Sequence, residues 1–151
     1  MENTSKNNYA KTCVLNVTAD VKDGKNYVSD VYFTSPFKVM KPFHLNKNYM
    51  TVMMQTASAG ILKGDTQELN FDIRDNASME LVSQSYEKLH KMDGGNARRD
   101  CTIKVGKNAL FKYSPLPTIP FYDSGFDSTI HAELADDTSK LILMEILTSG
   151  R

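Results

Sequence analysis

Residues 69–81 read LNFDIRDNASMEL, and this stretch decides the expected fold. Apolar residues occupy every second position on both sides of a polar turn at residues 75–77: Leu69, Phe71, Ile73, Met79 and Leu81. Such alternation is typical of a β-strand with one buried face. Asp and Asn are common turn residues because their side chains hydrogen-bond to the nearby backbone. The stretch therefore predicts a strand, a turn and a second strand.

The same pattern recurs twice farther along the chain. Ile73, Val105 and Leu134 each end an apolar alternation, and each is followed by a polar turn and another strand-like run. The spacings from residue 73 to 105 and from 105 to 134 are 32 and 29 residues. A repeat of this length indicates strand-turn-strand units stacked in series, each burying a face on its neighbour. The alternative is an ordinary antiparallel sheet, in which a similar strand-turn-strand pattern can recur without stacked units.

Most of the remaining chain also has the character of strands. Residues 13–17 alternate, residues 23–26 have hairpin-turn chemistry, and residues 49–56 read as a buried strand. Residues 83–92 form either a helix or the continuation of a long strand. We therefore expect an all-β, or nearly all-β, fold: stacked β-hairpins in an extended helical or sandwich-like architecture with at most one or two short helices. Residues 1–10 are expected to be a flexible tail, and residues 11–151 one domain.

The composition is that of a neutral, globular chain. The 151 residues include 18 Lys and Arg and 18 Asp and Glu, so the formal net charge is zero. Nucleic acids and anionic membranes recruit clustered positive charge, so we expect neither as a partner. The polar N-terminus lacks the apolar segment of a secretory signal. The sequence thus predicts a cytoplasmic protein, in which Cys13 and Cys101 stay reduced and pack as small apolar side chains.

Residue patterns that carry enzyme chemistry are weak in this sequence. The three histidines lie 46 and 41 residues apart, without a local metal-binding spacing: His44, His90 and His131. The glycines and lysine of residues 60–65 do not match a phosphate loop, because the lysine precedes the second glycine and a strand follows. We expect no enzymatic activity. A metal-assisted hydrolase assembled from the three histidines is the least favoured hypothesis.

Residues 113–122 concentrate three prolines beside exposed apolar residues. Proline lacks a backbone N–H, which confines such a stretch to a sheet edge or to a connection between sheets. The segment is either a rigid crossover or a surface that docks a partner.

Five short motifs occur in an order and spacing that resemble one known family. They are Pro36-Phe37-Lys38, GILKGD at residues 60–65, Ser83-Gln84-Ser85 with Lys88, PLPTIPF at residues 115–121, and Gly150-Arg151. The proline-rich motif and the Lys-Gly-Asp turn before a strand are the specific ones. Together they resemble the UreD/UreH family of urease accessory proteins over about residues 11–151. Members of that family continue past the Gly-Arg motif, so residues 11–151 are expected to be an N-terminal portion, truncated at the C-terminus.

The resemblance implies a non-enzymatic chaperone or scaffold for nickel delivery and assembly of the urease metallocentre. It implies UreF-type and UreG-type accessory proteins and the urease apoprotein as partners, with nickel in transit and no tightly bound cofactor. A polar tunnel through the protein is the proposed metal route in that family, where oxygen and amide ligands bind weakly enough to release the ion. The alternative is a β-rich module that binds another protein or a glycan through residues 115–122.

The resemblance also marks candidate site residues, although it marks no certain metal ligand. Five are expected to line polar space in such a tunnel: Asp65, Ser83, Gln84, Ser85 and Lys88. For Asp65, the alternative is a hydrogen bond within its own turn. Two glycines shape the backbone there, Gly60 and Gly64. Four residues are expected to form the docking surface or crossover: Pro117, Ile119, Pro120 and Phe121.

Overall fold

The computed structural model describes residues 10–46 and 48–149, which form thirteen β-strands and no helix. The all-β prediction is therefore confirmed. Residues 83–92, the segment in which a helix was possible, instead end one strand and form a second, short one. Across the described residues there is no helix that could cross a membrane. Nearly all of the predicted N-terminal tail, and the Gly150-Arg151 motif, lie outside the described residues.

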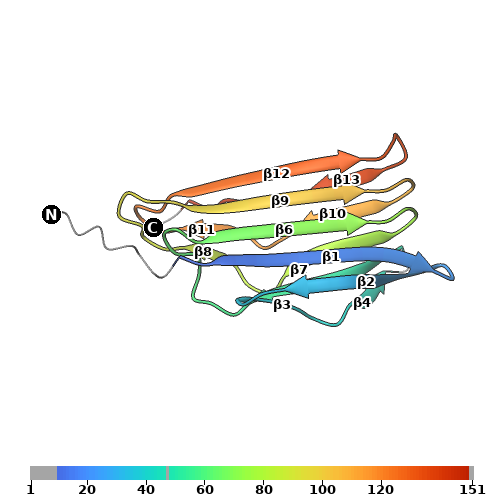
Figure 1. The fold of residues 1–151 in the computed structure, drawn as a ribbon, viewed down its shortest axis with the longest axis horizontal. Helices are drawn as coiled ribbons and strands as arrows, with labels where there is room; N and C mark the ends of the chain where they lie inside the picture. Colours follow the sequence, from blue (N-terminus) through green and yellow to red (C-terminus); the bar gives the residue numbers. More distant parts are fainter. Residues whose placement is uncertain (1–9, 47, 150–151) are drawn as a thin grey trace.

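Two large sheets face each other (Figure 1). The strands are β1 (Thr12–Lys22), β2 (Lys25–Phe33), β3 (Phe37–Val39), β4 (Phe43–Asn46), β5 (Tyr49–Thr56), β6 (Thr66–Ile73), β7 (Ser78–Ser83), β8 (Glu87–Leu89), β9 (Ala97–Val105), β10 (Leu110–Ser114), β11 (Thr118–Pro120), β12 (Phe126–Leu134) and β13 (Lys140–Leu143). One sheet has the order β12-β9-β6-β1-β2. The other has the order β13-β10-β7-β5-β3, with β4 also paired to β5.

Each strand-turn-strand unit crosses from one sheet to the other. β6 and β7 flank one turn but belong to different sheets, as do β9 and β10, and β12 and β13. Each strand pairs in parallel with its counterpart in the next unit, so Ile73 and Leu134 both lie beside Val105. The spacings of 32 and 29 residues are thus the register of the sheet, as the repeat predicts. The units are arches instead of hairpins, because their two arms face each other across the core.

A third, narrow sheet closes one end of the molecule, at the left in Figure 1. β8 pairs in parallel with β11. Ile61 bridges Leu89 on one side of this pair, and Leu147 bridges Thr118 on the other. Four successive passes of the chain therefore lie side by side along this face. The chain winds through three sides in turn, which is the helical stacking expected from the repeat.

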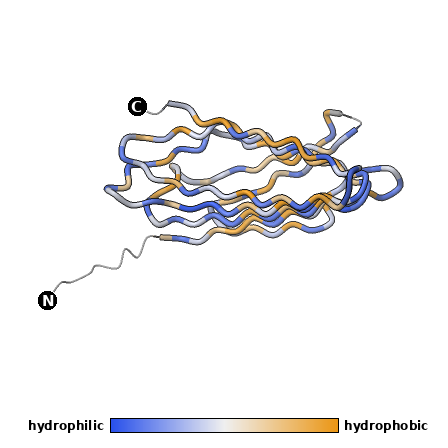
Figure 2. Tube along the Cα trace, turned by 90° about the horizontal axis from the view of Figure 1, so that it is seen from above, coloured by the Kyte–Doolittle hydropathy of each residue, from blue (hydrophilic) through white to orange (hydrophobic). Residues whose placement is uncertain are grey.

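The apolar core lies between the two large sheets. Phe71 of β6 packs on Phe111 and Tyr113 of β10, with ring centroids 5.2 and 6.0 Å away. All three side chains are almost fully buried. Figure 2 shows the hydropathy alternating along the strands that bring such residues inward. Burying one large apolar side chain stabilises the fold by about 1.5–3 kcal/mol, so this alternation supplies the main driving force for stacking.

The turns at the opposite end are hydrogen-bonded to one another. The Asn76 amide donates to the Lys107 carbonyl and the Lys107 amide donates to Asp75 Oδ1, both at 2.8 Å. The Asn108 amide donates to Thr138 Oγ1 at 2.8 Å. Asn76 and Asn108 have φ angles of 65° and 52°, which asparagine tolerates better than most residues. These polar turns tie each unit to the next and hold the register.

The two sides of the stack differ. On one side, β2 pairs antiparallel with β1, and β3 and β4 pair antiparallel with β5. On the other, β12 and β13 are the outermost strands of their sheets over the described residues. Apolar side chains near β13 are partly exposed: Ile142, Leu143, Met144, Ile146 and Leu147. β13 ends at Leu143, and Leu147 beyond it forms an isolated bridge to Thr118.

Candidate functional site

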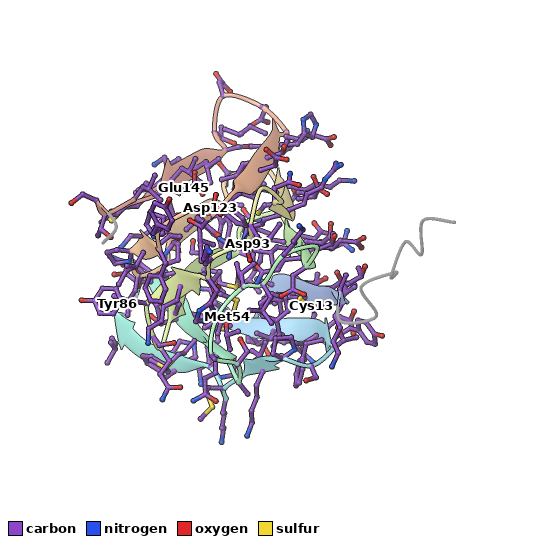
Figure 3. All side chains as sticks on the ribbon, turned by 90° about the vertical axis from the view of Figure 1, so that its left-hand side faces the viewer. Cys13, Met54, Tyr86, Asp93, Asp123 and Glu145 are labelled. Atoms are coloured by element: carbon purple, nitrogen blue, oxygen red, sulfur yellow. The ribbon has the colours of Figure 1, made fainter. Side chains whose placement is uncertain are left out.

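A row of polar side chains crosses the inner face of the first sheet. Sheet register places Cys13 of β1 beside Gln67 of β6, Gln67 beside Arg99 of β9, and Arg99 beside Ser128 of β12. Cys13, Gln67 and Arg99 are buried. The row lies next to the narrow third sheet, at the end of the molecule that Figure 3 faces. Gln67 and Arg99 are therefore polar residues at inward positions, between Cys13, which belongs to the apolar core, and Ser128, which is exposed.

Arg99 is the centre of this row. Its Nε donates to Gln67 Oε1 at 2.8 Å, and its Nη2 donates to Glu87 Oε2 of β8 at 3.1 Å. The guanidinium also lies over the Phe126 ring, 5.2 Å from the ring centroid. The Arg99 and Glu87 side chains are only 7% and 12% exposed, so this ion pair is almost fully removed from water. The Arg99–Gln67–Glu87 cluster thus joins the first sheet to the third.

Two cavities lie along the row, one beside each end of this cluster. The first, about 290 Å³, is lined by Cys13, Asp65 and Gln67 among others. The second, also about 290 Å³, is lined by residues that include Arg99, Ser128 and Glu145. Figure 3 labels Cys13 and Glu145, which lie at different levels of the stack. The two cavities share no lining residue, and the Gln67–Arg99 hydrogen bond lies between them.

The GILKGD motif borders the first cavity. The Leu62 amide donates to Asp65 Oδ2 at 2.9 Å, and the Lys11 amide donates to Asp65 Oδ1 at 3.3 Å. Asp65 thus makes the hydrogen bond within its own turn, and it also lines the first cavity, whereas its role in a tunnel stays a prediction. Gly60 and Gly64 have positive φ angles of 143° and 82°. Both glycines therefore have backbone conformations that side chains disfavour, in keeping with the turn expected of them.

The Ser-Gln-Ser motif divides between the interior and the surface. Ser83 and Ser85 line a small cavity together with Glu87 and Arg99. Ser83 Oγ also accepts a hydrogen bond from the Leu116 amide at 2.8 Å and so anchors the proline-rich segment. Gln84 and Lys88 are exposed and line none of these three cavities. Ser85 is exposed as well, so only Ser83 of these four residues is half-buried, and a role of the four in lining a tunnel stays a prediction.

The proline-rich segment connects the two large sheets. It leaves β10 in one sheet, forms β11 on the third face, and leads to β12 in the other sheet. Pro117, Ile119 and Pro120 are half-buried there, and Phe121 packs edge-on against His90, with ring centroids 5.3 Å apart. This is the geometry of the crossover. Leu116, Phe121 and Tyr122 keep exposed apolar surface, and partner docking through them stays a prediction.

The three histidines are held by separate partners. His44 Nε2 lies 3.1 Å from the Asn26 carbonyl oxygen, His90 Nε2 lies 3.0 Å from the Ala59 carbonyl oxygen, and His131 Nε2 lies 3.3 Å from Glu133 Oε1. Within residues 10–46 and 48–149, no group of three or more His, Cys, Asp or Glu side chains is placed to hold a metal ion. The geometry therefore gives no support to a catalytic site built from these histidines.

Burial raises the pKa values of two thiols and of the Glu87 carboxyl group. It raises the pKa of Cys13 to about 11 and that of Cys101 to about 12, so both thiols are protonated at neutral pH. Burial also raises the pKa of Glu87, and the Arg99 guanidinium opposes this shift only in part. Neither buried thiol therefore offers a thiolate at neutral pH.

The sequence interpretation did not select Gln67, Glu87 or Arg99. Arg98 and Arg99 are neighbours in the sequence, but Arg98 pairs on the surface, with Asp100 at 2.7 Å, whereas Arg99 is buried. A signal was present, because Gln67 and Arg99 fall on the inward positions of their alternations, two residues before Leu69 and Cys101. A polar residue at an inward position needs a buried partner. Glu87 belongs to a different strand, and its pairing with Arg99 depends on the third sheet.

Comparison with known proteins gives one consistent family. A family model described as UreD urease accessory protein matches residues 11–151. The urease accessory protein UreD of Acetivibrio thermocellus is 38% identical over 147 residues, which cover 97% of this chain and 56% of that protein. UreH of Helicobacter pylori strain P12 is 36% identical over 146 residues, covering 96% of this chain and 55% of that protein. The chain spans about half the length of the curated relatives that it matches.

Proposed function

Because the chain belongs to the UreD family of urease accessory proteins, we propose that it is a scaffold for nickel delivery and assembly of the urease metallocentre. In this proposal it acts without catalysing a reaction and binds nickel only in transit. Its partners are UreF-type and UreG-type accessory proteins and the urease apoprotein, in the cytoplasm. The resemblance inferred from the GILKGD and proline-rich motifs leads to the same family as the comparisons.

The polar row inside the sandwich is the observation that supports a role in metal transfer. Gln67 and Ser128 supply amide and hydroxyl oxygens, Asp65 and Glu145 supply carboxylates, and all four line the two cavities along the row. Nickel accepts oxygen and nitrogen ligands, and a path for an ion must bind it weakly enough to release it. Scattered single oxygens meet that requirement better than a closed cluster of ligands.

The experiment that tests this proposal is urease activation in cells that lack their own UreD-type protein. The chain is supplied with the other accessory proteins and the urease apoprotein, and nickel per urease active site is measured by atomic emission. A full-length relative, such as the Acetivibrio thermocellus protein, is the positive control. Co-purification of the chain with a UreF-type protein and urease apoprotein is measured in the same cells. A chain that neither co-purifies nor raises nickel incorporation above the empty-vector level contradicts the proposal.

Docking through the proline-rich segment is tested separately, with residues whose loss leaves the fold intact. Tyr122 is 77% exposed and Leu116 is 38% exposed, so a double change to serine removes apolar surface without opening the core. Loss of co-purification in this double variant assigns docking to the segment. Tyr32 is 55% exposed on the distant strand β2, and Tyr32→Ser is the matched control that should co-purify normally.

A further inference from the structure

We propose that the outer face of the β13-β10-β7-β5-β3 sheet is a docking surface for an amphipathic helix of a partner protein, with acidic residues beside its apolar stripe. The centre of this surface is a row of residues that crosses all five strands, which we call the methionine row. Sheet register places its members side by side, and backbone hydrogen bonds continue the register just past β3 and β13: Met40, Met53, Val82, Ser114 and Met144.

The methionine row points away from the core. Met53, for example, is half-buried and precedes the core residue Met54, and successive side chains of a strand point to opposite faces. Met40 and Met144, at the two ends of the row, are 39% and 45% exposed, and Ile142 beside the row is 48% exposed. Single exposed apolar residues are ordinary, whereas a contiguous apolar patch marks an interaction site. Methionine is flexible and is common on surfaces that adapt to a bound partner.

The shape of this surface fits one helix. Five strands spaced about 4.8 Å apart give the row a length of about 19 Å. A helix of about 13 residues covers that length, since it rises about 1.5 Å per residue. The strands beneath the row are already paired with one another, so a partner binds this face through its side chains and not as an added strand. Beside the row, Lys112 pairs with Glu80 at 3.0 Å and lies over the Tyr49 ring, so this pair presents little unpaired charge to a helix above it.

The charges around the row favour an acidic partner. The five strands carry Lys38, Lys112 and Lys140, and Glu80 is the only acidic residue among them. Lys38 is exposed, as is Lys41 three residues farther along the chain. The strands of the first sheet, in contrast, carry more acidic than basic residues. A chain without net charge therefore has one outer face with an excess of positive charge, and complementary charge on a partner favours docking there.

The test measures the binding of two synthetic helical peptides to the purified chain by fluorescence anisotropy. Both peptides carry a stripe of Leu at positions i, i+3, i+4 and i+7 with Ala elsewhere, and the stripe is flanked by Glu in one peptide and by Lys in the other. We expect the Glu peptide to bind at least about tenfold more tightly at low salt, and this preference should shrink at high salt, where exposed charges are screened.

A substitution in the middle of the row tests the location. Val82→Glu places a negative charge there and should weaken binding of the Glu peptide at least about tenfold. Thr102→Glu is the matched control, because Thr102 is also half-buried and lies between the core residues Cys101 and Ile103 of β9, so it points outward from the first sheet. This variant should bind the Glu peptide as the wild type does.

Circular dichroism first establishes that each variant is folded. If Val82→Glu does not fold, Met144→Glu takes its place, since Met144 is more exposed and lies at the end of the row. Equal binding of the two peptides, or binding that the folded row variant leaves unchanged, overturns the proposal. A wild-type dimer in analytical ultracentrifugation that the row variant dissociates overturns it as well, because a second copy of the chain then covers this face. These measurements use no urease component, so their failure leaves the proposed function standing, and a failure of urease activation leaves the docking surface standing.

Discussion

Gly60→Ala tests whether the GILKGD segment is fixed against the third sheet. Gly60 has a φ of 143°, and a Cβ built on it lies 2.5 Å from the backbone oxygen of Lys88. That distance is about 0.9 Å short of the 3.4 Å at which ordinary contact begins. The same oxygen accepts the hydrogen bond from the Ile61 amide at 2.8 Å. The added methyl group must therefore push the segment at Gly60 and Ile61 away from β8, to which this bond joins it.

The expected loss of stability follows from these two effects. A side chain in a disfavoured backbone conformation costs about 1–3 kcal/mol. Loss of the Ile61–Lys88 hydrogen bond adds about 0.5–1.5 kcal/mol. The free energy of unfolding should fall by about 2–4 kcal/mol, which is a large share of the usual stability of a domain.

Urea denaturation followed by circular dichroism measures this change. Gly24→Ala is the matched control, because Gly24 also has a positive φ, of 71°, but a Cβ there meets nothing within 4 Å. It should cost only about 1–2 kcal/mol, the strain of a left-handed conformation. Equal losses in the two variants would contradict this prediction, because they would show that the close approach of residue 60 to β8 has no effect on stability.

Three further predictions follow from burial. Phe111→Ala should lower the free energy of unfolding by about 3–5 kcal/mol in urea denaturation, because it empties the centre of the aromatic core, whereas the exposed Tyr32→Ala should change it by less than about 0.5 kcal/mol. Cys13 and Cys101, whose pKa values are raised to about 11 and 12, should resist a thiol-reactive dye at pH near 8 and react fully in urea; rapid labelling of the native chain would contradict their burial. The folded protein holds the Glu87 proton more tightly than the unfolded chain does, because its pKa is raised from 4.5, so Glu87 contributes a loss of stability as the pH rises above about 4.5. Between about pH 4 and 7, the free energy of unfolding measured in urea should therefore fall less with rising pH in Glu87→Gln than in the wild type. The same pH dependence in both proteins would contradict this contribution.

The stacking of the chain was readable in the sequence because a parallel register copies a sequence spacing directly. Ile73, Val105 and Leu134 are each followed by a polar turn, and the same residues lie side by side in the sheet. Alternation likewise placed Phe71 on the buried face. The choice between hairpin and arch was not readable, because the turn residues are similar in both. A unit is a hairpin if the backbones of its two strands hydrogen-bond to each other, and an arch if each strand hydrogen-bonds to a strand of a neighbouring unit.

The candidate site was readable only in part. Asp65 and Ser83 were marked through motifs, and both are half-buried residues that line a cavity. The central cluster was not found, although Gln67 and Arg99 hold inward positions two residues before core residues. The period of a strand shows that a polar side chain points inward, but it does not show what that side chain meets.

The strand pattern, the repeat of about 30 residues and the family could be predicted from the sequence, since each depends on residues close together along the chain. The contacts of Arg99 of β9 with Glu87 of β8 and Gln67 of β6, in contrast, became visible in the folded structure. These three residues belong to three strands on two sides of the stack, and their distances are set by how successive passes of the chain pack. The physical reason is that local spacing fixes register within a sheet, whereas contacts across the interior depend on the closure of all three sides.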